Sequence, residues 1–267
     1  MQTKLKNSRA WMRLPSGRHL DLINPDPFAW EDRDLAVRLA RTYRWGGESK
    51  WQIPLSVAQH SLTVLALVSA SAGEALAPAQ ARRELLHDAE EGFLGFDCIS
   101  PLKRALGQPF MDVSERLMVA VQTRYALPVW TPQQHAAHKV ADIVAAATEA
   151  LHCVGWSLEE LRDVLCLDVE VLQVDPLVAI YGGTPWEPWP ADVAAERFLA
   201  KLQELVDART CRATTRPAEP DPSTACPACN AEVRYSDWLV VEGRPELTAC
   251  PTCRKAFAVD AVWPQMN

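Results

Sequence analysis

Four cysteines in this 267-residue chain have a type and spacing that could bind a metal. They form two C-x-x-C pairs, one starting at Cys226 and one at Cys250, with twenty residues between the pairs. Each pair can place two thiolates on one side of an ion, and two pairs complete the closed tetrahedral shell of a structural zinc site. The alternative is four unrelated thiols or two redox pairs, but one redox motif would not need a twin at this spacing. The sequence therefore predicts one structural zinc, held by Cys226, Cys229, Cys250 and Cys253.

The adjacent pair His87 and Asp88 lies at the centre of a second predicted site. We expect both in one helix over residues 82–92, where adjacent side chains are about 100° apart and reach one ion only at the seam between them. Glu91 follows His87 by four residues and Asp88 by three, so it should point along the same seam, one turn further on. Glu90 should point well away. This arrangement offers two ligands and one carboxylate directed at the ion or at its water.

Two more ligands must come from other helices. His60 lies in the first turn of an otherwise apolar predicted helix, and Asp142 lies among apolar residues in a predicted helix over residues 133–153. A carboxylate in such surroundings is costly to bury unless it is paired or bound to a metal. Two histidines and two aspartates suit one divalent transition metal with open positions for water and substrate. Spacing alone leaves open that His60 is an ordinary core or surface residue and that Asp142 is solvated.

The elements that must position these side chains are mostly helical. Apolar residues recur at helical spacing, and no strand is expected before residue 225. The buried face of the helix over residues 133–153 should consist of Val140, Ile143, Val144, Ala147 and Leu151. The predicted helices span residues 34–43, 56–72, 82–92, 111–125, 133–153, 158–166 and 191–208.

The composition changes near residue 209. Residues 209–224 contain several prolines and arginines and no large apolar residue, which is typical of a linker. Short alternating runs at residues 238–241 and 256–259 then predict strands. The predicted fold is therefore an all-α body over residues 1–208, a linker over residues 209–224 and a small β-type zinc ribbon over residues 225–267.

Composition and charge narrow the classes of function. Hydrophobic residues make up 48% of the chain and charged residues 23%, as in packed globular proteins. The net charge of −7 argues against a general nucleic-acid or membrane binder, and residues 226–255 carry equal numbers of basic and acidic side chains. The sequence has neither an apolar run long enough to span a bilayer nor a secretory signal pattern, so we expect a cytoplasmic protein.

The order of His60, the His87–Asp88 pair and Asp142 resembles that of the HD-domain metal-dependent phosphohydrolases. The resemblance covers roughly residues 15–155 and is closest to the bacterial and phage branch that includes 5′-deoxynucleotidases and dATP triphosphohydrolases. It implies an all-α HD-domain fold that holds one divalent metal (manganese, cobalt, zinc or iron) between helices. The matching stretches are Ser16–Arg18, Leu22–Pro27, Arg44–Gly47, Ser56–Ser61, Leu85–Glu91, Leu94–Gly95, Pro101–Lys103, Ala141–Asp142 and Ala147–Ala150.

The resemblance also implies roles for single residues. Glu91 matches the family's HDxxE acid, which resembles a general acid/base beside the metal-bound water. Arg44 and Lys103 match an arginine and a P-L-K lysine that could contact phosphate, although both could also be ordinary surface charges. Arg44 could instead pack against the base, and Trp45 could border the nucleoside.

The chain departs from the family pattern at two positions. The usual Leu-Gly-Asp is Leu-Gly-Phe-Asp here, so it stays open whether Asp97 contacts a sugar hydroxyl or a metal-bound water. Glu48 stands in a loop where relatives often show a basic residue, so phosphate recognition there could differ. The zinc ribbon lies outside the minimal family domain.

The sequence thus predicts a metal-dependent phosphohydrolase that acts on deoxynucleotides. Both the release of phosphate from a monophosphate and the release of triphosphate from a dNTP use this ligand set, so the choice between the two reactions stays open. One alternative is a catalytically idle HD scaffold whose ribbon binds a protein partner, but intact ligands argue against it. Another is a nucleic-acid-processing enzyme recruited by the ribbon, which the net charge disfavours. The expected partner is a nucleotide, without membrane or nucleic acid, and homo-oligomer formation is left open.

Overall fold

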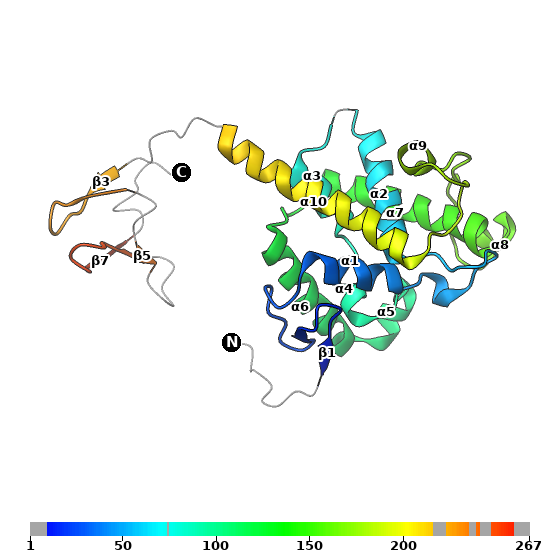
Figure 1. The fold of residues 1–267 in the computed structure, drawn as a ribbon, viewed down its shortest axis with the longest axis horizontal. Helices are drawn as coiled ribbons and strands as arrows, with labels where there is room; N and C mark the ends of the chain where they lie inside the picture. The colour runs from blue at the N-terminus through cyan, green and yellow to red at the C-terminus, as the bar shows by residue number, and fades with distance from the viewer. Residues whose placement is uncertain (1–9, 74, 216–222, 235–238, 241–246, 259–267) are drawn as a thin grey trace. The chain divides into compact units, whose positions relative to one another are not determined.

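The computed structural model describes residues 10–73, 75–215, 223–234, 239–240 and 247–258. The chain divides into two compact units, Met1–Thr210 and Cys211–Asn267. The first unit is mostly helical, and the strands that follow residue 222 belong to the second (Figure 1).

Ten α-helices account for most of the described residues. They are α1 (Asp32–Arg41), α2 (Val57–Ser71), α3 (Pro78–Leu85), α4 (Ala89–Leu94), α5 (Ser100–Leu106), α6 (Gln108–Tyr125), α7 (Pro132–Glu149), α8 (Leu158–Asp163), α9 (Val178–Tyr181) and α10 (Ala191–Thr215). A short 3-10 turn, η1 (Trp45–Gly47), follows α1, and one π-helical turn, η2 (Ala150–Val154), continues α7. The main-chain N–H of Gln59 donates to the Ser56 hydroxyl, so Ser56 caps α2, the helix that carries His60.

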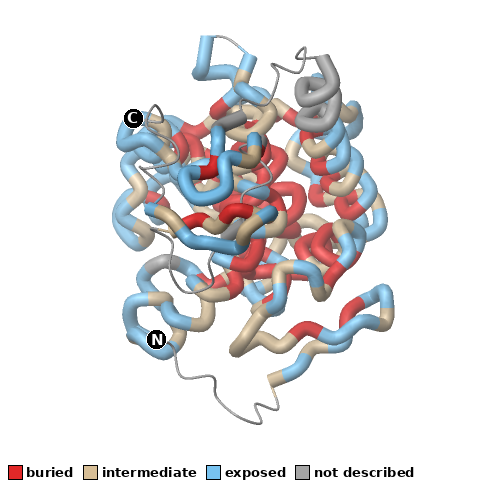
Figure 2. Tube along the Cα trace, turned by 90° about the vertical axis from the view of Figure 1, so that its left-hand side faces the viewer, coloured by how far each residue is buried: buried red, intermediate tan, exposed pale blue. Residues whose placement is uncertain are grey.

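The hydrophobic core of the helical body lies between α1, α2, α4 and α6, and α10 adds Phe198 and Leu202 to it (Figure 2). The close approach of α4 to α1 depends on Gly92. A Cβ atom at that position would lie 3.0 Å from Leu39 Cγ and 3.3 Å from the Leu39 main-chain nitrogen. Because backbone cannot yield as a flexible side chain does, the small residue holds α4 against α1.

The expectation of no strand before residue 225 is wrong. Strands β1 (Trp11–Arg13) and β2 (His19–Asp21) form an antiparallel hairpin, with Met12 opposite Leu20. The turn between them contains Gly17 at φ +88°, a conformation that glycine adopts without strain. Strands of three residues are too short for their alternation to stand out in a sequence.

The predicted buried face of the helix over residues 133–153 is confirmed at Ala147 but wrong at Val140 and Ile143. Val140 is 65% exposed and Ile143 38% exposed, whereas Ala141 and Ala145 are buried beside α2. The small side chains let α7 pack closely on α2, and this rotates the larger apolar residues outward. Periodicity alone favoured the larger residues, since it cannot weigh how closely two helices approach.

The linker predicted over residues 209–224 is wrong at both ends, and residues 216–222 lie outside the described residues. Residues 209–215 continue helix α10, and residues 223–224 belong to strand β3 (Ser223–Ala225). Alanine and arginine are good helix formers, so a run without large apolar residues can still extend a helix.

The second unit contains short antiparallel strands. Strand β3 pairs with β4 (Glu232–Arg234), and β6 (Leu247–Ala249) pairs on either side with β5 (Leu239–Val240) and β7 (Ala256–Ala258). The predicted strands at 238–241 and 256–259 are confirmed at 239–240 and 256–258, and residues 238, 241 and 259 lie outside the described residues.

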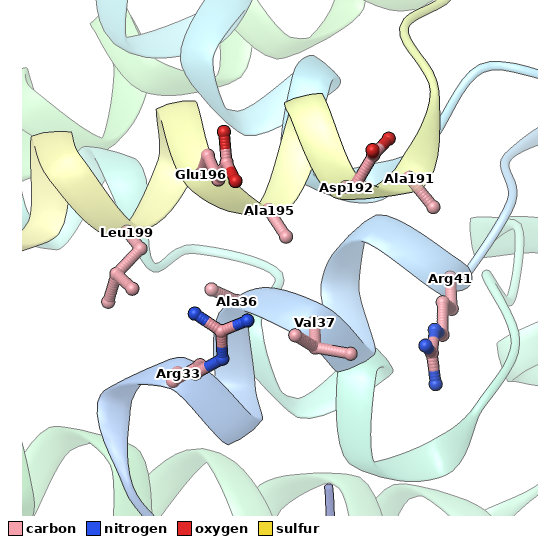
Figure 3. Close-up of a pocket in the computed structure, with 9 residues that line it drawn as sticks. All are labelled: Arg33, Ala36, Val37, Arg41, Ala191, Asp192, Ala195, Glu196 and Leu199. Carbon is pink, nitrogen blue, oxygen red and sulfur yellow. The ribbon is translucent and has the colours of Figure 1, made fainter.

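A cavity of about 150 Å³ lies between α1 and α10 (Figure 3). Arg33, Val37 and Arg41 border it from α1, and Asp192 and Glu196 from α10. It shares no residue with the predicted sites. Within the described part of the chain, no helix combines the length and apolarity that crossing a membrane requires.

Candidate metal centres

The structure brings the four predicted ligands His60, His87, Asp88 and Asp142 together. The Nε2 atom of His60 lies 3.3 Å from His87 Nε2 and 3.3 Å from Asp142 Oδ1. The Oδ2 atom of Asp88 lies 3.2 Å from His87 Nε2 and 3.7 Å from His60 Nε2. Ligands at about 2.1 Å from one ion are separated by about 3.0–3.4 Å in octahedral or tetrahedral geometry. The separations of 3.2 and 3.3 Å fit neighbouring positions around one cation, and the 3.7 Å between Asp88 and His60 is slightly longer than this range.

Two packed helices and one turn deliver these ligands. Helix α2 carries His60 and α7 carries Asp142, and α2 packs on both α3 and α7. The expected continuous helix over residues 82–92 is wrong, since α3 ends at Leu85 and α4 begins at Ala89. His87 and Asp88 lie in the intervening turn, where Asp88 has φ −112° and ψ 25°. Because His87 and Asp88 lie in a turn, their side chains are not held about 100° apart as in a helix, and both point at His60.

The same turn overturns the prediction for Glu90. Glu90 is 6% exposed, and one carboxylate oxygen each from Asp88, Glu90 and Glu91 lies within 4.8 Å of the others. The Ser114 hydroxyl donates to Glu90 Oε1 at 3.3 Å. Burial, followed by the charge of Asp88, raises the pKa of Glu90 to about 7. Glu90 is therefore part of the carboxylate cluster and does not point away from it.

Glu91 is also buried and titrates abnormally. Burial and the charges of Asp88 and Asp97 raise the pKa of Glu91 well above its ordinary value. Lys103, reaching in from α5, opposes this shift through its Nζ atom 3.0 Å from Glu91 Oε1. Glu91 Oε2 and Glu90 Oε2 are buried without a hydrogen-bond partner among the described residues. Such oxygens are normally satisfied by water or a ligand.

Arg44 lies inside the site as a paired cation. Its Nε donates to Glu149 Oε2 at 2.8 Å, and its Nη1 lies 3.7 Å from Asp97 Oδ2 and 3.9 Å from Asp88 Oδ2. Burial would lower the pKa of Arg44, but these three carboxylates outweigh it and raise the pKa above its ordinary value. Arg44 therefore stays charged and ties the loop after α1 to the carboxylate cluster.

Trp45 is half-buried. It lies against a small apolar cluster that includes Ala147, Leu161 and Val171. Its Nε1 is buried without a partner among the residues the structure describes. The contacts of Trp45 are thus those of a packing residue, and its contact with a nucleoside stays a prediction.

Glu149 is a functional residue that the sequence analysis did not single out. His60 Nδ1 lies 2.6 Å from Glu149 Oε1, which leaves His60 Nε2 facing the other ligands. Histidines that bind metals commonly donate their second ring N–H to a carboxylate in this way. Glu149 follows Asp142 by seven residues, two helical turns on the same face, and this spacing could have identified it.

The donor set fits a divalent cation. Burial and Arg44 act to lower the pKa of His60, but Glu149 and Asp142 raise it to about 10. The carboxylates that favour a proton on His60 would equally favour a cation bound to its nitrogen. Imidazole nitrogens together with carboxylate oxygens suit manganese, cobalt, zinc or iron.

The four cysteines of the second unit form a second group that could hold a metal. Cys226 Sγ lies 3.7 Å from Cys253 Sγ, and Cys229 Sγ lies 3.8 Å from Cys250 Sγ. Four thiolates at about 2.3 Å from a tetrahedral ion are separated by about 3.8 Å. The observed separations therefore match a single zinc.

The two C-x-x-C turns share one backbone conformation. The main-chain N–H of Cys226 donates to the carbonyl of Ala231, and that of Cys250 to the carbonyl of Lys255. The residue after each pair has a left-handed φ, +58° at Asn230 and +61° at Arg254. Equivalent turns present their thiolates in the same way, as expected for two halves of one shell.

Cys250→Ser is expected to remove the zinc and leave the His/Asp cluster able to bind manganese. The thiolate shell has no open position, and within each unit the metal centre uses only its own residues. Elemental analysis should give about one zinc per chain fewer for the variant than for the wild type, because the His/Asp cluster could also hold zinc. Cys166→Ser, at an exposed free cysteine of the helical body, is the matched control and should retain zinc. Loss of manganese binding in Cys250→Ser with an intact helical spectrum would contradict this independence.

Glu90→Gln is expected to stabilise the metal-free protein at pH 8 but not at pH 4. A carboxyl whose folded pKa is raised contributes stability below its unfolded pKa, and that stability is lost as the pH rises through the folded value. For a shift from 4.5 to about 7, removing the titration gains up to about 3 kcal/mol at pH 8. Urea unfolding of both proteins at pH 4 and pH 8 measures this difference in the free energy of unfolding. Equal stability of the two proteins at pH 8 would show that Glu90 ionises freely.

Comparison with known proteins gives one relative. No family model matches the chain. A segment of 153 residues is 41% identical to a protein of Rhodobacter capsulatus described as uncharacterized, and covers 57% of this chain and 77% of that protein. The chain belongs to the same family as this Rhodobacter protein. Since the relative's description names no activity, an activity for this family must be argued from the site itself.

Proposed function

We propose that the protein is a metal-dependent phosphohydrolase that acts on deoxynucleotides. The observation that carries this proposal is the convergence of two imidazole nitrogens and two carboxylates beside the buried acid Glu91. The ordered match of these residues to the HD-domain phosphohydrolases supports the reaction class. The described distances support only a metal-binding cluster, so the reaction stays the proposal.

His60, His87, Asp88 and Asp142 would hold the ion. A bound divalent cation supplies Lewis-acid chemistry at a phosphoryl oxygen and lowers the pKa of water. Glu149 holds His60 so that its Nε2 faces the site. The chain thus brings the donor atoms together without the ion.

Glu91 is the proposed general acid. Because burial and two carboxylates raise its pKa, it holds a proton at a pH where an ordinary glutamate has lost it. Glu91 can therefore donate that proton to the leaving oxygen of the nucleoside as the phosphorus–oxygen bond breaks.

Lys103 is better placed than Arg44 to meet the substrate phosphate. The Lys103 side chain is 22% exposed, whereas that of Arg44 is 9% exposed and already lies near three carboxylates. Arg44 then acts mainly to balance charge within the site, and Lys103 supplies the cation for phosphate.

A substrate screen tests the proposed function. The purified full chain is incubated with Mn²⁺, Co²⁺ or Zn²⁺ and each dNMP, dNTP and NTP, and the products are separated by chromatography. We expect turnover of deoxynucleotides, with phosphate or triphosphate as the second product. Bound metal without any turnover would favour the idle scaffold whose ribbon binds a protein. The cytoplasmic location, the absence of nucleic-acid partners and the oligomeric state stay predictions.

A further inference from the structure

Glu84 and His138 form a buried pair beside the proposed ligands, and neither has a role in the reaction above. Glu84 is 1% exposed in the last turn of α3, and His138 is 2% exposed in α7. His138 Nδ1 lies 2.8 Å from Glu84 Oε2, and Trp130 Nε1 donates to Glu84 Oε1 at 2.6 Å. Each oxygen of the Glu84 carboxylate therefore has one hydrogen-bond partner, and the buried side chain is hydrogen-bonded on both sides.

The pair is in direct contact with the ligand His87. The main-chain oxygen of Glu84 accepts from His87 Nδ1 at 2.8 Å. The ring of His138 meets the ring of His87 edge-on, with centroids 4.8 Å apart and planes at 65°. Trp130 stacks on His138, with centroids 4.4 Å apart and planes at 25°. Glu84 thus holds His87 with its backbone and His138 with its side chain.

The pair also links α7, which carries Asp142, to the end of α3, just before the turn that carries His87. His138 precedes Asp142 by four residues, so the two lie one turn apart on the same face of α7. Glu84 lies three residues before His87. A hydrogen bond between Glu84 and His138 therefore fixes the part of α7 that carries Asp142 against the turn that carries His87.

His138 has the second hydrogen bond that is typical of metal-bound histidines, but it is not placed as a ligand. His60 and His87 each give Nδ1 to a protein oxygen, Glu149 Oε1 and Glu84 O respectively, and His138 does the same to Glu84 Oε2. Among the described residues, the group with ligand atoms within 4.8 Å of one another contains His60, His87 and Asp88. Neither Asp142 nor His138 belongs to that group, but Asp142 Oδ1 lies 3.3 Å from His60 Nε2, whereas His138 contacts the ring of His87. His138 can therefore affect the ion only through the ligands that it touches.

We propose that Glu84 and His138 are positioning residues that hold His87 and Asp142 in place for one divalent cation. The inference rests on the metal centre of the proposed function but not on its reaction. Partners of this kind typically change metal affinity by about 10–100-fold when they are removed.

A manganese titration of the full-length protein, followed by the electron paramagnetic resonance signal of free Mn²⁺, tests the proposal. Manganese prefers nitrogen and oxygen ligands, so the thiolates of the ribbon should not compete. His138→Phe keeps an aromatic ring but loses the N–H donor, and should raise the Kd by about 10–100-fold. His138→Asn keeps a donor at the place of Nδ1 and should recover most of that affinity. Glu84→Gln, which cannot accept on both sides, should behave like His138→Phe.

His135→Phe is the matched control. His135 is exposed on the same helix and contacts the same Trp130, with ring centroids 5.5 Å apart. Its contact is with Trp130 and not with Glu84, so its replacement should leave the Kd for Mn²⁺ unchanged. The melting temperature of each variant is measured alongside, because a purely structural pair would lower it in His138→Phe and His138→Asn without separating their Mn²⁺ affinities.

The outcomes separate this proposal from the proposed function. Weak Mn²⁺ binding by His138→Phe and recovery in His138→Asn support the positioning role, whether or not any nucleotide is hydrolysed. Unchanged binding in His138→Phe and Glu84→Gln overturns it while leaving the metal centre intact. A wild type that binds no Mn²⁺ overturns both. If His138→Phe does not fold, Glu84→Gln and His138→Asn decide between the same outcomes.

Discussion

Asp88→Asn is expected to reduce nucleotide hydrolysis to the uncatalysed background while leaving the fold intact. Asp88 Oδ2 lies within 4 Å of His87 Nε2, His60 Nε2 and Arg44 Nη1, so this atom is at the centre of the site. Burial acts against its ionisation, yet the charges of His87, His60 and Arg44 keep the pKa of Asp88 well below its ordinary value. Asparagine keeps the size of the side chain but removes the anionic ligand that a divalent cation needs.

The measurement is the initial rate at saturating Mn²⁺, together with the metal content and the far-ultraviolet circular dichroism of the variant. Asp163→Asn is the matched control, because Asp163 lies in α8 with a side chain that is 61% exposed. It should retain the wild-type rate. If Asp88→Asn loses activity but retains Mn²⁺ with wild-type affinity, Asp88 is not a ligand and the proposed donor set is wrong.

The ligands could be predicted from the sequence because their chemical types are scarce and their order is distinctive. The chain has only six histidines. Two of them, together with Asp88 and Asp142, follow the order His … His-Asp … Asp of the HD-domain phosphohydrolases. The paired cysteines are identifiable for the same reason, since the spacing of each pair is fixed by the turn that it forms. Such signals depend on short segments and do not require knowledge of how helices pack.

The surroundings of the ligands could not be predicted in this way. The apolar spacing predicted one helix through His87, whereas the structure has a turn there between α3 and α4. This turn brings Glu90 into the carboxylate cluster. Glu84, Glu149 and His138 act across helices that are far apart in sequence, so no local pattern identifies their partners. Whether a buried charge is compensated depends on these long-range pairs, and they become visible only once the helices are packed.

Glu91→Gln is expected to lower kcat by about 10²–10⁴-fold while Mn²⁺ affinity stays near the wild-type value, as for the loss of a general acid. Burial and the charges of Asp88 and Asp97 raise the pKa of Glu91, so its carboxyl keeps a proton to a higher pH than an ordinary glutamate does, and the amide of glutamine cannot donate a proton in this way. Lys103 Nζ lies 3.0 Å from Glu91 Oε1, and glutamine changes this contact, so KM is measured as well as kcat. A change confined to KM would mean that Glu91 positions Lys103 and transfers no proton.

Glu90→Gln is the matched control for Glu91→Gln, since it makes the same chemical change one residue earlier in α4. Glu90 accepts from Ser114, and its nearer oxygen lies 3.9 Å from Lys103, compared with 3.0 Å for Glu91. The neighbouring position tests whether a buried acid with a raised pKa is sufficient for catalysis. If proton donation depends on the placement of one carboxyl, Glu90→Gln should stay within about tenfold of the wild-type kcat. Equal losses in both variants would instead assign the effect to the charge of the whole cluster, and Glu91 would have no individual role as the acid.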